Sequence, residues 1–161
     1  MTPPIILDIE ASGFGKNSYP IEVGFIDESL NAWCTLIKPE EDWQHWDSDA
    51  ANMHAITRES LLKHGKSAKL VAQTLNDQLR DKIVYSDGWI HDFTWISLLF
   101  ESAKISQRFK LEDLRNVLTA KQEATWHATK NLVQQELKTE RHRASSDAKV
   151  LQLTWVRTHE N

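Results

Sequence analysis

The feature that most constrains the fold is a short apolar run near the start of the chain, which ends on two carboxylates. Residues 4–9 read Pro-Ile-Ile-Leu-Asp-Ile and are followed by Glu10. A run this rich in β-branched residues is typical of a strand buried on both faces, which predicts the centre of a larger sheet. Because side chains two residues apart in a strand point to the same face, we expect Asp8 and Glu10 to converge where this strand leaves the core.

Further strands and helices follow in an order typical of an α/β protein. Residues 20–26 and 32–37 predict two strands joined by a turn, and residues 82–85 predict a fourth strand. Helices are expected from Thr57, over residues 67–80, 94–103, 111–118 and 124–137, and after an N-cap at Ser145. An antiparallel meander followed by a parallel crossover strand makes a mixed sheet, in which sites form at the carboxyl ends of the strands.

Length and composition predict a single domain over residues 1–161. The one cysteine, Cys34, cannot form an internal disulfide, so we expect an intracellular, cytoplasmic protein. No apolar run approaches the roughly 18 residues of a membrane span, and the first residues lack the pattern of a signal peptide. The formal net charge of −4 does not favour a long nucleic-acid footprint, but it allows a small site where bound cations supply the positive charge.

Four carboxylates and one histidine carry the candidate chemistry. Asp8 and Glu10 place like charges together, which is unfavourable unless a cation balances them, and hard oxygen ligands suit Mg²⁺ or Mn²⁺. Asp147 falls in the first turn of the last helix, and His142 lies five residues before it, where an imidazole can take a proton from water. Asp92 follows the strand at residues 82–85. Taken alone, each has a simpler interpretation: a strand end meeting solvent, a helix cap or a surface histidine.

In combination and in this order, the motifs resemble the DnaQ-like, or DEDDh, 3′→5′ exonucleases of the ribonuclease H-like superfamily. The matching segments are residues 7–13, Asp92, and residues 142–148 with their H-x-x-x-x-D spacing. Residues 21–24 resemble the second strand of the family, and residues 53–57 resemble its H-x-I-T segment. The resemblance covers nearly the whole chain.

The surroundings of these motifs differ from the family pattern at a few positions. Gly88 stands where the family often has asparagine, and His91 where it often has an aromatic residue. Ala11-Ser12 stands in place of the frequent Thr-Thr. These departures bear on how a substrate would be held.

The resemblance implies a ribonuclease H-like fold, with a mixed five-stranded sheet flanked by helices. It implies two-metal hydrolysis that releases nucleoside 5′-monophosphates from the 3′ ends of single-stranded DNA or RNA. Two divalent cations, Mg²⁺ or Mn²⁺, would be held by Asp8, Glu10, Asp92 and Asp147, with Asp8 bridging both and His142 as general base. The implied substrate contacts are Ala11, Ser12, Gly13, Phe14, Met53 and His54. Because some relatives are dimers, the chain could also form a homodimer.

Several alternatives stay open at this point. The chain could be a non-catalytic module of the same fold that binds nucleic acid or protein, or a phosphodiesterase acting on small nucleotides. Met53 could be a core residue and His54 a turn partner. The aromatic stretch Trp43, His45 and Trp46 could stack on a second base or pack internally, and Lys16, Arg141 and Arg143 could contact phosphates or be solvated.

Overall fold

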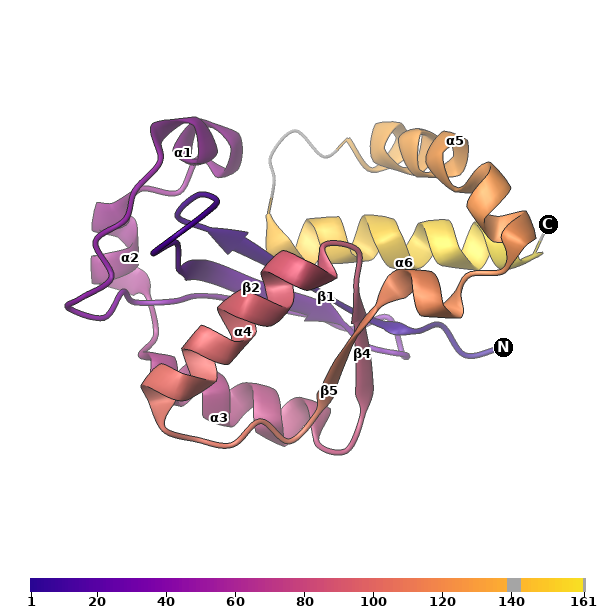
Figure 1. Ribbon diagram of the computed structural model, residues 1–161. Coiled ribbons are helices and arrows are strands. Elements are labelled where there is room, and N and C mark those ends of the chain that lie inside the picture. Colours follow the sequence, from indigo (N-terminus) through magenta and orange to yellow (C-terminus); the bar gives the residue numbers. More distant parts are fainter. Residues whose placement is uncertain (139–142, 161) are drawn as a thin grey trace.

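The computed structural model describes residues 1–138 and 143–160 and shows a five-stranded sheet with helices on both faces (Figure 1). The strands lie in the order β3-β2-β1-β4-β5. Their bounds are β1 (Ile5–Ala11), β2 (Pro20–Ile26), β3 (Ala32–Leu36), β4 (Ile83–Ser86) and β5 (Lys110–Asp113). β2 pairs antiparallel with β1 and β3, whereas β4 pairs parallel with β1 and β5. The expected mixed five-stranded α/β sheet is therefore confirmed.

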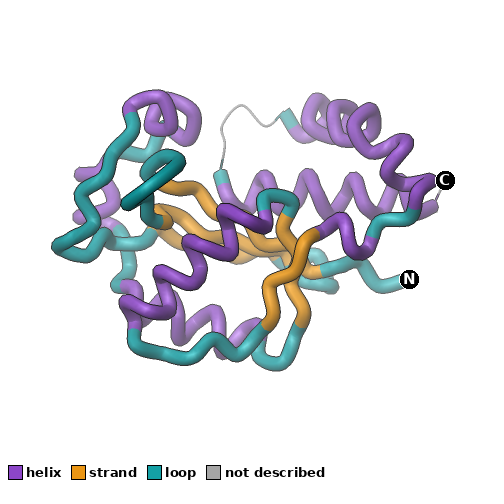
Figure 2. The backbone as a smooth tube through the Cα atoms, viewed as in Figure 1, coloured by secondary structure: helices purple, strands orange, loops and turns teal. Residues whose placement is uncertain are grey.

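Six α-helices and a short 3₁₀ helix, η1, accompany the sheet in the described part of the chain. Their bounds are α1 (Ser48–His54), α2 (Arg58–His64), α3 (Ala68–Leu79), α4 (Trp89–Ala103), η1 (Leu114–Val117), α5 (Ala120–Leu137) and α6 (Ala144–Glu160). α6 packs on β1 and β2, and α5 covers α6, while α3 and α4 lie together on the opposite face (Figure 2). Among the described residues, no helix combines the length and apolar character needed to cross a membrane.

The alternation of β1 divides the core into two parts. Ile5, Leu7 and Ile9 belong to the larger cluster, which α3 and α4 complete. Ile6 points the other way, into the smaller cluster that includes Leu151 of α6. Asp8 and Glu10 share the parity of Ile6 along the strand, so they lie on the face that α6 covers. The register of β1 thus fixes which helix can complete a site with these two carboxylates.

The prediction of a helix over residues 111–118 is wrong. Residues 110–113 form β5, in which Leu111 pairs with Val84, and η1 follows directly. The apolar spacing of this segment matches a helix, but pairing beside β4 buries Leu111 and Asp113 caps η1 through the Arg115 N–H. Tertiary pairing thus overrides a local pattern.

Three helices begin earlier than expected. α6 begins at Ala144, so Ser145 lies inside the helix and the predicted N-cap at Ser145 is wrong. α4 begins at Trp89 rather than Thr94, which places Asp92 inside its first turn. α5 begins at Ala120 rather than Ala124, after a capping box between Thr119 and Gln122. Such a box satisfies the free N–H groups of the first turn, so it sets where the helix starts.

Candidate metal centre and adjoining cavity

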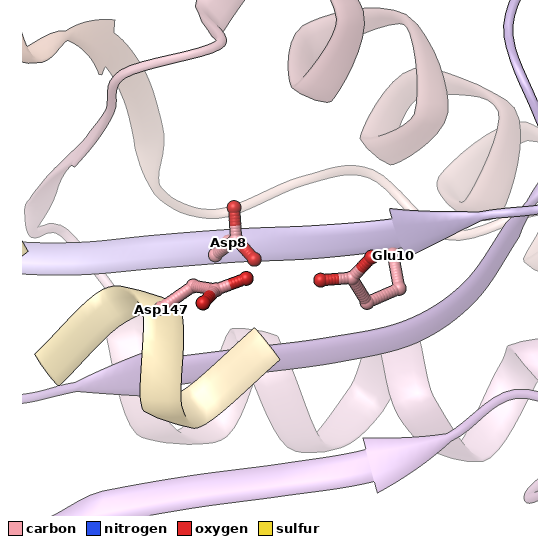
Figure 3. A group of neighbouring side chains, drawn as sticks. All are labelled: Asp8, Glu10 and Asp147. Atoms are coloured by element: carbon pink, nitrogen blue, oxygen red, sulfur yellow. The ribbon is translucent and has the colours of Figure 1, made fainter. Parts of the chain in front are cut away.

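Three carboxylates converge at the carboxyl-terminal part of β1. Figure 3 shows Asp8 and Glu10 of β1 and Asp147 of α6 pointing toward one another. One oxygen from each of the three lies within 4.8 Å of the others. This spacing lets a single ion contact all three groups, because Mg²⁺ and Mn²⁺ take carboxylate oxygens as ligands. The structure therefore brings together three of the four carboxylates proposed as ligands from the sequence.

The charge of this cluster is poorly balanced by the protein itself. Burial raises the pKa of Asp8 well above its ordinary value, and the charges of Asp92, Glu10, Asp147 and Asp87 raise it further. Burial is also the main reason that the pKa of Glu10 rises to about 9, helped by a hydrogen bond with Asp147 and by the charge of that residue. Without a bound cation, protons must offset the charge of the cluster, so the three carboxylates are suited to bind a cation.

Asp8 also has an oxygen that the described residues leave without a partner. Its Oδ2 is buried and accepts no hydrogen bond from the described part of the chain. A buried carboxylate oxygen without a partner costs stability unless something else compensates for the lost water. A bound cation would provide that compensation, so the oxygen fits the role of a metal ligand.

Asp92 lies apart from the three-carboxylate group. It is buried in α4, where the Ser86 hydroxyl donates a hydrogen bond to its Oδ2. Burial raises the pKa of Asp92 to about 7, which the Ser86 hydrogen bond opposes and the charge of Asp87 reinforces. Because its charge also raises the pKa of Asp8, Asp92 is near enough to share an electrostatic environment with the cluster. Its role as a ligand of a second ion stays a prediction.

The start of α6, and with it Asp147, is held by the buried Glu22 of β2. Glu22 is 0% exposed, and its Oε1 accepts the Ala144 N–H at 2.7 Å. The Arg143 guanidinium donates to Glu22 Oε2 through Nε at 2.9 Å and Nη2 at 2.5 Å. Gly24 allows this close approach, since a Cβ there would lie 2.5 Å from the Ser145 nitrogen. The phosphate contact considered for Arg143 is thus replaced by an ion pair that anchors α6.

A cavity of about 250 Å³ opens beside the cluster. Five of the six residues proposed to contact substrate line it: Ala11, Gly13, Phe14, Met53 and His54. Asp8, Glu10 and Asp92 line it as well, so the carboxylates and the proposed substrate contacts face one space. Met53 is 58% exposed and hence not a core residue, whereas the buried His54 accepts the Ile56 N–H at Nδ1 and so does act as a turn partner.

The aromatic side chains of Phe14, His91 and Trp95 form one wall of this cavity. The Phe14 and His91 rings meet edge to face with centroids 5.0 Å apart, and His91 stacks on Trp95 at 5.7 Å. Phe14 is 67% exposed, so its ring is accessible to a ligand in the cavity. An accessible aromatic ring of this kind can stack on the face of a nucleobase.

Comparison with known proteins reveals similarity of fold. No protein-family model matches the sequence, and no curated protein matches it. Among solved structures, E. coli exonuclease I in complex with a dT13 oligonucleotide aligns over 73% of this chain with a TM-score of 0.58 and 15% sequence identity. A moderately thermophilic exonuclease I from Methylocaldum szegediense aligns over 72% with a TM-score of 0.55 and 15% identity. The chain spans 29% and 28% of those two chains. The sheet and its helices thus have the expected ribonuclease H-like fold.

Other residues named from the sequence lie elsewhere. Ser12 is buried and does not line the cavity, because its hydroxyl is engaged by His45 Nδ1 at 2.9 Å and accepts the Tyr19 N–H at 3.0 Å. Trp43 is buried and stacks on Tyr19, so the internal-packing alternative holds for it. His142 and Arg141 lie outside the described residues.

Three residues near the centre were missed by the sequence reasoning. Asp87 follows β4 directly and lines the cavity, so the rule applied to Asp8, an acid at a strand end, would have found it. Glu22 lies in the segment that resembles the family, but nothing in the sequence pairs it with Arg143, 121 positions away. Lys130 of α5 approaches the centre through the packing of α5 on α6, for which the sequence offers no signal.

Proposed function

We propose that the chain is a metal-dependent 3′→5′ exonuclease of the DnaQ-like, DEDDh type, with residues 1–161 as one exonuclease domain. The observation that carries the proposal is the convergence of Asp8, Glu10 and Asp147, with a buried unpartnered oxygen on Asp8, beside a cavity with an aromatic wall. Carboxylates that converge in this way suit the ions that assist phosphodiester hydrolysis. The three carboxylates and the cavity come from a single copy of the chain.

The structural neighbours support the proposal. E. coli exonuclease I has been solved with dT13 and dA16 oligonucleotides, and in a zinc-bound form with single-stranded DNA. The shared fold, which is found in proteins solved with single-stranded DNA, supports binding of single-stranded nucleic acid by this chain. We extend that binding to single-stranded DNA or RNA for this chain, with nucleoside 5′-monophosphates as products.

The carboxylates, the histidine and the cavity residues would have separate roles in the reaction. Asp8, Glu10 and Asp147 would hold one divalent ion, Mg²⁺ or Mn²⁺, and Asp8 with Asp92 would hold a second. When bound, the ions would offset the charge of the phosphate and stabilise the charge that develops on the attacking water oxygen and on the leaving 3′-oxygen. His142 would take the proton from the attacking water. Phe14 and Met53 would flank the terminal nucleoside, which aligns its phosphodiester with the carboxylates.

The test is divalent-dependent release of mononucleotides from labelled single-stranded DNA, single-stranded RNA and short dinucleotides. We expect release with Mg²⁺ or Mn²⁺, none with EDTA, and none from the folded variants Asp8→Ala and Asp147→Ala. His142→Ala should slow the reaction and change its pH profile while leaving metal affinity nearly intact.

Each alternative has its own outcome. Binding of oligonucleotides without cleavage would make the chain a binding module, and cleavage of dinucleotides alone would make it a small-nucleotide phosphodiesterase. Full activity in Asp8→Ala or Asp147→Ala would show that the proposed site is wrong.

A further inference from the structure

A second cavity also borders Asp8. It has a volume of about 190 Å³, and its polar lining consists of Asp8, Asp87, Lys130, Gln134 and Asp147. α5 contributes Lys130 and Gln134, and α6 contributes Asp147. Asp8 and Asp87 also line the first cavity, so the two spaces meet at these carboxylates.

Lys130 is the one lysine or arginine among the described residues that line the two cavities. Its side chain is 29% exposed, and its Nζ lies 3.5 Å from Asp87 Oδ2. That distance exceeds the usual range of an N–H···O hydrogen bond, so the contact is an ion pair without tight geometry. The ammonium group can therefore move from Asp87 to another anion at little cost.

The size of the second cavity limits what it can hold. Ligand cavities that enclose a whole small molecule usually measure about 300–1,000 Å³. Both cavities, of about 250 Å³ and about 190 Å³, are below this range, so each can hold only part of a nucleotide, and the lining residues decide which part. The aromatic wall belongs to the first cavity, whereas the second offers an ammonium group, an amide and carboxylates. The first is thus suited to a nucleobase and the second to backbone.

Because Asp8 lines both cavities, it relates the position of the terminal base to that of the rest of the strand. In the proposed reaction the terminal base lies in the first cavity, and the scissile phosphate lies at the carboxylates that would hold the ions. Because Asp8 and Asp87 line both cavities, a strand that continues past Asp8 would enter the second cavity. Bound cations offset the negative charge of Asp8 and Asp147, so a further phosphate can approach Lys130.

We propose that the second cavity is a subsite for the sugar-phosphate backbone on the 5′ side of the scissile bond, in which Lys130 binds the first non-scissile phosphate. Gln134 of the same helix donates from its side-chain amide to that phosphate or its sugar. This inference rests on the proposed function and specifies its substrate: a strand with a phosphate beyond the one that is cut. A substrate without that charge loses the contact.

The experiment removes the charge of Lys130 and the charge of one substrate phosphate, separately and together. Hexathymidylate is compared with the same oligomer carrying one neutral methylphosphonate at the linkage 5′ to the scissile one. The proteins are wild type, Lys130→Met, Lys130→Arg and a control, Lys121→Met, which removes an exposed lysine elsewhere on α5. Release of thymidine 5′-monophosphate gives KM and kcat, and thermal melting confirms that each variant is folded.

We expect Lys130→Met to raise KM on hexathymidylate about tenfold, with a smaller change in kcat, and Lys130→Arg to remain near wild type. The methylphosphonate should raise the KM of wild type by a similar factor and leave that of Lys130→Met unchanged. The slope of log Kd against log salt should become shallower by about 0.7, as one phosphate contact in a single strand predicts. Lys121→Met should behave like wild type.

Two results would overturn the subsite: an unchanged KM in Lys130→Met, or equal sensitivity of wild type and Lys130→Met to the methylphosphonate. If wild type releases no mononucleotide, the proposed function fails, and the subsite is judged separately by fluorescence anisotropy of labelled hexathymidylate in CaCl₂. About tenfold weaker binding by Lys130→Met would then support it, and equal affinity would refute it.

Discussion

Replacing Asp8 with asparagine is expected to stabilise the protein when no metal is present and to remove the stabilisation that metal confers. Asparagine has nearly the same shape as aspartate, but it carries no charge. The substitution therefore relieves the repulsion among Asp8, Glu10 and Asp147 while keeping the packing of β1. It also removes the carboxylate that borders both cavities and would bridge the ions.

The magnitude follows from the geometry of the cluster. Two ionised carboxylates about 4.8 Å apart repel by about 3.5 kcal/mol at an effective dielectric constant of about 20. Part of this repulsion is already relieved by bound protons, because the pKa of Glu10 is raised to about 9 and that of Asp8 is raised well above its ordinary value. We therefore expect a gain of about 2 kcal/mol, which raises Tm by about 4–8 °C in a chain of this size.

Metal reverses the order of the two proteins. An ion at about one hundred times its Kd stabilises the folded state by about 2.7 kcal/mol if the unfolded chain does not bind it. Wild type should gain this increment with MnCl₂, whereas Asp8→Asn should gain little. Scanning calorimetry in EDTA and in MnCl₂ measures both terms. Asp77→Asn is the matched control, because it neutralises an exposed aspartate on α3.

Two outcomes would contradict this reasoning. A Tm for Asp8→Asn below that of wild type in EDTA would mean that the Asp8 charge is satisfied within the protein. An equal MnCl₂-dependent rise in both proteins would place the ion elsewhere.

Two further predictions follow from the site and its support. In EDTA the free energy of unfolding should fall as pH rises from about 5 to about 9. The reason is that Glu10 and Asp92, with folded pKa values of about 9 and about 7, retain protons that the unfolded chain releases. Each group contributes a decrease of up to about 1.4 kcal/mol per pH unit between its unfolded and its folded pKa. Urea denaturation across this range checks the sign, and increasing stability would refute it. Gly24→Ala should lower the free energy of unfolding by about 1–3 kcal/mol and weaken Mn²⁺ binding, because its Cβ would lie 2.5 Å from the Ser145 nitrogen and displace α6. Calorimetry and metal titration measure these effects, and unchanged metal affinity would separate Gly24 from the site.

The centre of the fold was predictable because its signals are local. An apolar run ending on Asp8 and Glu10 specifies both a buried strand and the face that carries two acids. The first turn of α6 specifies Asp147 in the same way, since a carboxylate is favoured there. The structure then brings these three acids together, as the order of motifs indicated.

What sequence reasoning missed depends on contacts between distant segments. Residues 111–118 have helical apolar spacing, but residues 110–113 form a strand because β4 lies beside them. Glu22 looks like any strand carboxylate until Arg143 and the Ala144 N–H meet it. Lys130 is an ordinary helix lysine until α5 packs on α6 and brings it to Asp87. Each depends on tertiary packing that no local pattern encodes.

The anchoring of α6 on β2 has a consequence for when the centre can exist during synthesis. Asp8 and Glu10 are synthesised well before Asp147, which arrives with α6, the last described helix. A nascent chain that has not yet released α6 from the ribosome holds two of the three acids and lacks the helix that covers them. The sheet can begin to form in that interval, but the metal centre cannot. If the centre hydrolyses nucleic acid, it stays inert until α6 has left the ribosome and packed on β2.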